Sequence, residues 1–166
     1  MPIVNNPTDH GEHIEQIRAA IEHRATWMYL LLDEARKRGL DWDDFARQAI
    51  TKCGEFHGKT KFTATDSIQH FAGEFATETF KKVFEMNIVE LNDERFVVEF
   101  NYCPLVSGWL KQEANDKDVE TLCDIAMDGD RGIISEFQAF DFDLQSTIAQ
   151  GDKVCRIVIS RTKTVE

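Results

Sequence analysis

The sequence predicts an α+β fold, in which an antiparallel sheet of about four strands is covered on one face by helices. Apolar residues recur at helical spacing through most of the first 84 residues. Two later segments, 88–102 and 135–160, instead alternate in polarity and are interrupted by short turns. The 166 residues suffice for one core. We therefore expect one domain, with a helical part over residues 1–65 and an α+β part over residues 66–166.

The first element is predicted to be a long helix. From residue 8 to about residue 38, apolar side chains recur every three or four positions. Thr8 is a suitable N-cap, and Gly39 is a stop signal just past the last periodic residue. The pattern is compatible with one continuous helix and with a helix broken near Arg24.

Two more helices are expected before the first strand. Acidic residues at 41–44 suit the positive N-terminal end of a helix, which is expected to end near Gly54. Residues 56–62 contain a glycine between polar residues and are interpreted as a loop. Helical spacing then returns from residue 66 to residue 84, which predicts a single third helix.

The pattern next changes to a period of two. Residues 88–89 are assigned to one strand, residues 92–93 to a turn, and residues 96–102 to a second strand with alternating apolar side chains. Together they predict an antiparallel hairpin. A similar pattern over residues 135–149, a turn at Gly151-Asp152 and a last strand over 153–161 predict a second hairpin.

Two helices are expected between the hairpins. Pro104 suits the first position of a helix, where its missing N–H is not needed, and this helix runs to about Glu113. A second helix is predicted over residues 116–128. Its end is placed at Gly129 and Gly132, because glycine commonly follows the last turn of a helix.

Composition and charge narrow the class of protein. The net charge is −11 and the basic residues are scattered, so a nucleic-acid partner is not expected. No apolar run approaches the roughly 20 residues that a membrane span needs. Residues 1–13 lack the basic and apolar regions of a signal peptide. We expect a cytosolic protein with a small-molecule substrate, no cofactor, and no membrane partner.

The four cysteines are expected to be reduced in the cytosol. No two form a CxxC pair, which excludes a zinc ribbon or a thioredoxin-type motif. Cys103 has the clearest case for chemistry, because it ends a strand just before the helix that starts at Pro104. The free N–H groups of that helix would lower the pKa of its thiol and favour a nucleophilic thiolate. The alternative is a cysteine packed under Trp109.

Cys123 and Cys155 are candidates with equally plain alternatives. Cys123 lies on the apolar stripe of its helix, where it either packs as a small hydrophobe or lines a pocket with Asp124 or Asp128. Cys155 alternates with apolar residues and suits core packing. Cys103, Cys123 and Cys155 would converge if both strands belong to one sheet. Their spacing carries no metal signature, and no metal site is assigned.

Other polar residues are weaker candidates. The aspartates after Cys123 do not fit the ligand positions of an EF-hand, and a polar helix end is the simpler interpretation. His57 either lines a cleft or is exposed, and a Cys–His pair is possible only through the fold. Arg131 and Arg156 are candidates to grip a substrate carboxylate, although exposed structural arginines are common. Trp109, near Cys103 in sequence, is included among the substrate-binding candidates.

Three segments together resemble a known family. They are YCPLVSGW at 102–109, LCDIAMDGDRG at 122–132 and TIAQGDKVCRIVIS at 147–160. In this order and spacing they resemble the L-2-amino-thiazoline-4-carboxylic acid hydrolase family, over roughly residues 66 to 160. The resemblance implies a hydrolase in which water or an enzyme nucleophile adds to the amidine carbon of a thiazoline. The ring C–S bond then breaks and yields N-carbamoyl-cysteine.

The resemblance also implies roles for individual residues. The three cysteines named above match cysteine positions of the family, and Arg131 or Arg156 would hold the carboxylate. Asp124 would serve as the base, although Asp128 also fits the acidic position expected after the middle cysteine.

Two alternatives to an enzyme remain open. The family is similar in its helices and sheet to vinyl-reductase-type and Golgi-transport ligand-binding domains, which suggests a non-catalytic ligand-binding, metal-binding or sensor domain. The long N-terminal helix also suggests a homodimer, because its apolar stripe could exceed what one core covers. That stripe contains Ile14, Ile21, Met28 and Leu32.

Overall fold

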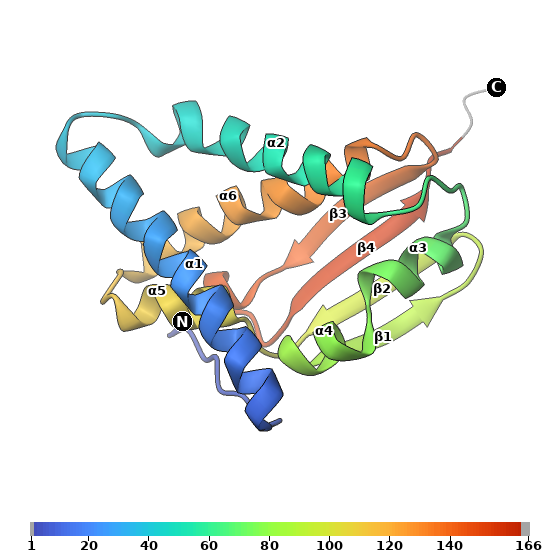
Figure 1. Ribbon diagram of the computed structural model, residues 1–166, viewed down its shortest axis with the longest axis horizontal. Coiled ribbons are helices and arrows are strands. Elements are labelled where there is room, and N and C mark those ends of the chain that lie inside the picture. Colours follow the sequence, from blue (N-terminus) through green and yellow to red (C-terminus); the bar gives the residue numbers. More distant parts are fainter. Residues whose placement is uncertain (1, 164–166) are drawn as a thin grey trace.

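The computed structural model describes residues 2–163 and has helices packed against a four-stranded sheet (Figure 1). In chain order the elements are α1 (Glu12–Lys37), α2 (Trp42–Lys61), α3 (Ile68–Phe75), α4 (Glu78–Val83), β1 (Met86–Leu91), β2 (Arg95–Phe100), α5 (Pro104–Lys111), α6 (Asp116–Ser135), β3 (Phe140–Ser146), the 3-10 helix η1 (Ile148–Gln150) and β4 (Cys155–Arg161). The predicted α+β class is confirmed.

The sheet consists of two hairpins joined side by side. Its strand order is β1-β2-β4-β3, and every neighbouring pair is antiparallel. β2 and β4 are therefore the central strands. In their register Val98 lies opposite Ile157, and Phe100 lies opposite Cys155. Since Cys103 follows Phe100 by three residues, this register brings the chain near Cys103 to the sheet end where β4 begins.

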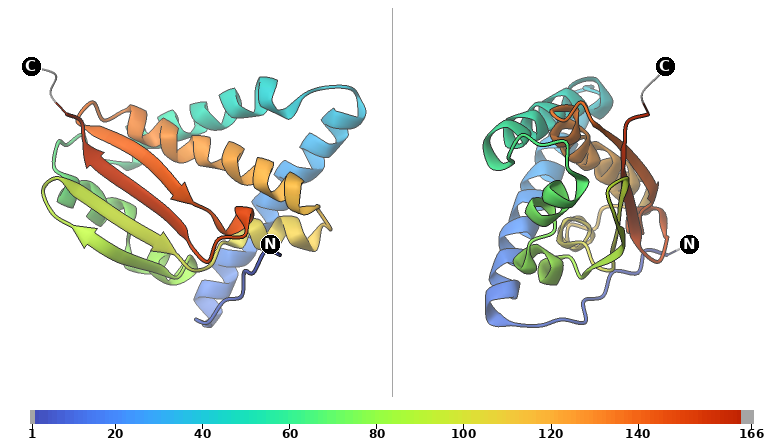
Figure 2. Two further views of the ribbon diagram at one scale, coloured as in Figure 1. Left: turned by 180° about the vertical axis from the view of Figure 1, so that it is seen from behind. Right: turned by 90° about the vertical axis from the view of Figure 1, so that its right-hand side faces the viewer.

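The helices cover one face of the sheet, as the view along the sheet in Figure 2 shows. Two apolar clusters fill the space between the layers. One joins α1, α2, α5, α6 and η1 and includes the fully buried Trp109, Leu122 and Ile148. The other joins α3, the C-terminal end of α6 and the sheet, with the stacked or edge-on rings of Phe71, Phe137 and Phe140 at its centre.

Helices α2 and α6 continue beyond the glycines that were expected to end them. α2 passes through Gly54 and the predicted loop over residues 56–62 to Lys61, and α6 passes through Gly129 to Ser135. The glycines instead allow the two helices to touch. A Cβ atom on Gly54 would lie 2.0 Å from the carbonyl oxygen of Gly129, which no side chain can tolerate.

The predicted third helix is in fact two. α3 ends at Phe75, and α4 starts afresh after Thr77, whose hydroxyl accepts a hydrogen bond from the Phe80 N–H at 3.3 Å. Apolar spacing continues across this break because both helices bury their side chains against the same core. A capping threonine inside a periodic segment was the sequence signal for the break.

α1 runs without a break past Arg24 and buries the stripe that suggested a dimer contact. Ile14, Ile21 and Leu32 are all less than 9% exposed, because α4, α5 and the start of α2 cover this face of the helix. A second copy would therefore have to contact a different surface. No helix within residues 2–163 is long and apolar enough to cross a membrane.

Candidate functional site

The three cysteines singled out in the sequence come together at one end of the sheet. Cys103 lies between β2 and α5, Cys155 is the first residue of β4, and Cys123 lies on α6 facing the same apolar cluster. A negative charge on Cys103 would raise the thiol pKa of both Cys123 and Cys155, so the three side chains are close neighbours. No disulfide joins them.

The expected low pKa of Cys103 is wrong. Cys103 does precede α5, and the N–H groups of Val106 and Leu105 act to lower its pKa as expected. Burial is the larger effect, because an ionised sulfur loses more stabilisation from water here than it gains from hydrogen bonds to the two N–H groups. The pKa of the Cys103 thiol is therefore raised, and the resting group is a neutral thiol.

Cys155 and Cys123 are also neutral thiols at pH 7. Burial is the main cause of the raised pKa of both, and for Cys155 it reaches about 12. The Sγ atom of Cys155 accepts a hydrogen bond from the Ile148 N–H at 3.2 Å. Cys123 interacts with the Thr147 side chain. The segment that leads into η1 therefore holds both sulfur atoms in place.

Asp130 is a functional candidate, although the sequence predicted only a polar helix end at this position. It lies inside α6 and is partly buried. Burial raises the pKa of its carboxyl group to about 6, although the positive charges of Arg24 and Arg131 act in the opposite direction. The Asp130 carboxylate in turn raises the pKa of Cys103. A carboxyl group that titrates near neutrality and whose charge acts on a thiol is a candidate general base.

Arg24 and His57 complete the polar part of this region. Arg24 on α1 forms no salt bridge within residues 2–163, yet its charge acts on Cys103, Asp130 and His57. His57 lies on α2, not in a loop, and is half-buried. Burial, followed by the charges of Lys61 and Arg24, lowers its pKa, so its imidazole is neutral at pH 7.

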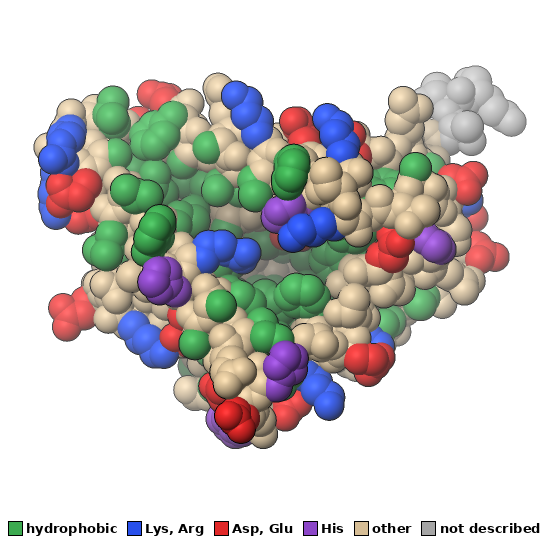
Figure 3. Space-filling model, viewed as in Figure 1, with side chains coloured by type: hydrophobic (Ala, Val, Ile, Leu, Met, Phe, Trp, Pro, Cys, Tyr) green, Lys and Arg blue, Asp and Glu red, His purple; other side chains and the backbone are tan. Residues whose placement is uncertain are grey.

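A hollow opens on the face where α1 and α2 diverge. Figure 3 shows apolar side chains inside the hollow, with Lys, Arg and His side chains around it. Figure 1 shows that α1, α2 and α4 surround this region in the same view, with the sheet and α6 behind them. Arg24 and His57 belong to the two helices that border the hollow, whereas Asp130 belongs to the helix behind it.

Asp124 and Arg131, the predicted base and substrate anchor, bind each other. Arg131 donates to the Asp124 carboxylate at 3.0 Å and to Asp128 at 2.7 Å. Arg47 of α2 contacts the same two carboxylates, at 2.7 and 3.2 Å. Burial acts to raise the pKa of Asp124, but the two arginines outweigh it and the net pKa is lowered. This arginine–aspartate network joins α2 to α6.

The remaining candidates make structural contacts. Arg156 is on β4 and contacts Glu99 and Gln145 on the neighbouring strands. The Trp109 ring is fully buried, and its Nε1–H donates to the Ala25 carbonyl oxygen at 3.0 Å. It packs α5 against α1 and presents no surface to a substrate.

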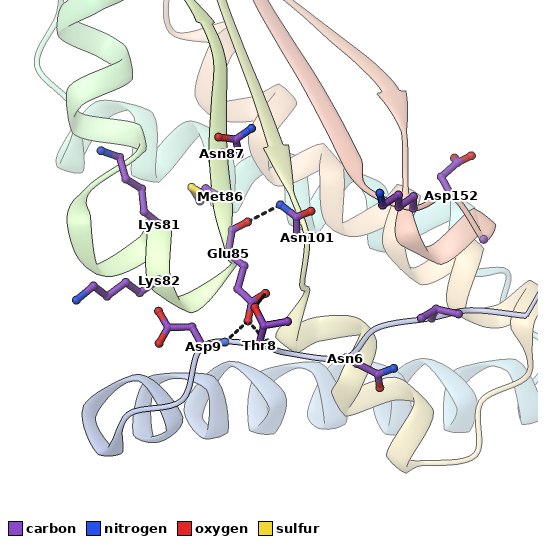
Figure 4. A pocket seen from close by; sticks show the side chains of 13 residues that line it. Asn6, Thr8, Asp9, Lys81, Lys82, Glu85, Met86, Asn87, Asn101 and Asp152 are labelled. Carbon is purple, nitrogen blue, oxygen red and sulfur yellow. Dashed lines mark hydrogen bonds between the residues drawn. The ribbon is translucent and has the colours of Figure 1, made fainter.

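Metal-binding clusters and surface grooves are two other kinds of candidate site. Among residues 2–163, no group of three or more His, Cys, Asp or Glu side chains is placed to hold a metal ion. An open groove of about 900 Å³ lies between the N-terminal segment, α4 and the ends of β1 and β2 (Figure 4). Its lining includes Lys82, Asn87 and Asn101 but none of the three clustered cysteines.

The chain is similar to a solved structure and matches a family. No protein with a curated description matches the chain. One solved structure that does match is the crystal structure of a trafficking protein particle complex subunit 3 from Naegleria fowleri covalently bound to palmitic acid. The identity is 14%, the TM-score is 0.40, and the match covers 94% of this chain and 86% of that chain.

The family match covers more of the chain than the three segments that resemble the family. The match begins within α1, at residue 18, and ends within β4, at residue 159. It therefore includes the N-terminal helices that carry Arg24 and His57 as well as all three clustered cysteines. The chain belongs to the L-2-amino-thiazoline-4-carboxylic acid hydrolase family.

Proposed function

We propose that this protein is a hydrolase that opens the ring of a small cyclic amidine bearing a carboxylate, of the 2-amino-thiazoline-4-carboxylate type. The proposal rests mainly on the grouping of Cys103, Asp130 and Arg24, which come from three different elements and whose charges act on one another. This grouping combines a sulfur nucleophile, a carboxyl group with a pKa of about 6 and a cation. Family membership supports the reaction class.

The proposed reaction starts from a neutral thiol. Asp130 takes the proton from Cys103 as the sulfur forms a bond to the amidine carbon. The proton then passes from Asp130 to the ring sulfur as the ring C–S bond breaks, which leaves the carbon attached to Cys103. Water adds to this carbon with Asp130 again acting as base. Departure of the Cys103 sulfur, which regains its proton, releases N-carbamoyl-cysteine, and the net change is the addition of one water.

Arg24 is the proposed anchor for the substrate carboxylate. Arg131 is committed to Asp124 and Asp128, and Arg156 to Glu99. The Arg24 guanidinium has no salt-bridge partner within residues 2–163, so both edges of its fork remain available to a carboxylate. The network around Asp124 is accordingly assigned to structure, and Asp130 replaces Asp124 as the base.

The direct test is turnover of 2-amino-thiazoline-4-carboxylate, measured as the appearance of N-carbamoyl-cysteine by mass spectrometry. Cys103→Ala is expected to lower turnover by at least about a hundredfold, because the covalent step is lost. Cys123→Ala and Cys155→Ala are expected to have smaller effects. Cys53→Ala is the matched control, since Cys53 is exposed on α2. Turnover unaffected by all three clustered substitutions would rule out cysteine chemistry.

Asp130 gives a second, independent test through pH. The carboxylate must be ionised to accept a proton, so kcat/KM is expected to rise with pH through about 6. Asp130→Asn is expected to lower turnover by about 10² or more and to abolish this limb of the profile. An unchanged profile in Asp130→Asn would assign the base to another group, with His57 the first to examine.

A non-catalytic binding domain is the second candidate function. The observation that favours it is the raised pKa of all three clustered thiols, which leaves them neutral in or against an apolar cluster. Native mass spectrometry and elemental analysis of the purified protein test this candidate. A stoichiometric ligand or metal together with absent turnover would support binding, whereas an empty protein that turns over the thiazoline would exclude it.

A further inference from the structure

The N-terminal segment, residues 2–11, crosses the edge of the molecule from the sheet to the start of α1 (Figure 2). It reaches the thiol cluster through one side chain, that of Asn5. The Asn5 Nδ2 donates to the Cys103 carbonyl oxygen at 2.9 Å, and its Oδ1 accepts from the Cys103 N–H at 2.8 Å. One carboxamide therefore contacts both backbone polar groups of the proposed nucleophile, from a position 98 residues away, and the Cys103 carbonyl oxygen also accepts from the Ser107 N–H at 3.1 Å.

This pair of hydrogen bonds fixes the conformation of Cys103. Residue 103 has an extended backbone, with φ −132° and ψ 111°, and joins β2 to α5 without a strand partner of its own. The Asn5 carboxamide takes the place of a neighbouring strand. The Cys103 sulfur interacts with the N–H groups of Leu105 and Val106 at the start of α5, and the residue is partly buried.

The segment is held in place independently of Asn5. The Glu85 carboxylate accepts hydrogen bonds from the Thr8 hydroxyl at 2.9 Å and from the Asp9 N–H at 2.8 Å, as Figure 4 shows. Arg18, which is almost fully buried, donates to the Asp9 carbonyl oxygen at 2.6 Å. Loss of the Asn5 carboxamide therefore removes the contact to Cys103 while these anchors remain.

We propose that Asn5 is a positioning residue for Cys103, which holds the backbone of the nucleophile so that its sulfur stays buried at the start of α5. The inference rests on the proposed function for its catalytic meaning. Its structural part, the control of one thiol out of three, can be measured without any substrate.

The experiment measures alkylation of each cysteine by iodoacetamide between pH 6 and pH 9.5, with the labelled peptides quantified by mass spectrometry. Cys53→Ala serves as the background, so that the exposed thiol does not consume reagent. Asn5→Ala is compared with Asn6→Ala, which removes the same group from the adjacent residue that faces the open groove. Asn5→Ala is expected to speed Cys103 alkylation at pH 7.5 by about fivefold or more and to shift its pH profile downwards.

The pattern across the three thiols decides between positioning and simple destabilisation. Positioning predicts that Cys103 changes while Cys123 and Cys155 keep their rates, and that Asn6→Ala resembles the background protein. Equal increases at all three thiols, or no change at Cys103, would overturn the proposal. In the turnover assay, Asn5→Ala is expected to lower kcat by about tenfold with little change in KM, because Arg24 is untouched.

The two proposals fail in different ways. If the background protein shows no turnover but Cys103 alone responds to Asn5→Ala, the hydrolase assignment fails and the positioning role stands. If turnover is present and depends on Cys103 but neither kcat nor the alkylation profile responds to Asn5→Ala, the hydrolase assignment stands and the positioning role fails.

Discussion

Helix α6 carries two acidic regions that differ in almost every physical respect. Asp124 and Asp128 meet Arg47 and Arg131 in a network of short ion pairs that joins α6 to α2. Asp130, two residues beyond Asp128, has no salt-bridge partner within residues 2–163, and its charge acts to raise the pKa of Cys103. Burial acts to raise the pKa of Asp124, but its arginines outweigh this effect and lower the pKa. Burial raises the pKa of Asp130 to about 6.

The difference shows that pairing, more than position in the sequence, decides which carboxylate is available for proton transfer. A carboxylate held by two arginines binds its protons weakly and is a poor base at neutral pH. An unpaired, partly buried carboxylate titrates near the pH at which an enzyme operates. The same helix therefore supplies a structural ion network and a candidate base.

The largest expected effect comes from breaking the contact between α2 and α6, because both acidic regions lie on α6. Arg47 and His57 reach α6 and the hollow because α2 lies against α6 at Gly54. In Gly54→Ala the new Cβ atom would meet the Gly129 carbonyl oxygen, so the helices must separate. We expect a loss of about 3 kcal/mol in the free energy of unfolding, measured by urea denaturation.

The control for this change is Gly73→Ala in α3, where a Cβ atom would meet nothing within 4 Å. Because alanine favours helix more than glycine does, this control is expected to gain about 0.5–1 kcal/mol. If the two variants had equal stability, close packing of α2 on α6 would not be needed for the fold.

The next largest effect is on how stability depends on pH, which differs between the two acidic regions. The folded pKa of Asp130 is raised from 3.8 to about 6, so the folded state holds this proton more tightly than the unfolded state. The contribution of Asp130 to stability therefore falls as pH rises from about 4 to 6, and the full penalty remains above 6. Asp130→Asn is expected to be about 2 kcal/mol more stable than wild type at pH 7.5 and equal to it near pH 3.

Thermal or urea unfolding across this pH range is the measurement, with Asn6→Ala as a neutral reference. A variant less stable than wild type at pH 7.5 would mean that the Asp130 carboxylate contributes a favourable contact there, and the comparison between the two regions would then collapse.

The smallest effect concerns the paired region. The folded pKa of Asp124 is lowered, so its contribution to stability is present above the unfolded pKa of 3.8 and is lost as pH falls below that value. Asp124→Asn is expected to cost about 0.5–1 kcal/mol at pH 7, since the group is nearly half-exposed, and progressively less as pH falls below 3.8. Turnover should stay within about twofold of wild type. A hundredfold loss of turnover would restore Asp124 as the base.

Much of the fold could be predicted from periodicity alone. The strands, the hairpin pairing and the helix that starts at Pro104 followed from local patterns. In these elements the spacing of apolar residues along the sequence matches the face that is buried in the core. The ends of α2 and α6 could not be predicted. Gly54 and Gly129 are helix terminators in local statistics, and only the tertiary contact between the two helices reveals their use in close packing.

The placement of the candidate residues was predicted in part for the same reason. The convergence of three cysteines followed from placing Cys103 and Cys155 in one sheet and Cys123 on a covering helix. The pKa of Cys103 was predicted with the wrong sign, because a helix terminus is visible in the sequence whereas depth of burial is not. Arg24 and Asp130 were missed, since the lack of a salt-bridge partner is a property of the surroundings and leaves no local pattern.

The neutrality of the clustered thiols has a consequence for chemical proteomics. Profiling methods rank cysteines by how quickly they react with a soft electrophile, and that ranking follows access and ionisation. In this protein such a survey will mark Cys53, which is exposed on α2, and pass over Cys103. Covalent probes for this family should therefore be built on a substrate-shaped scaffold, which brings its own recognition and does not depend on an ionised sulfur at rest.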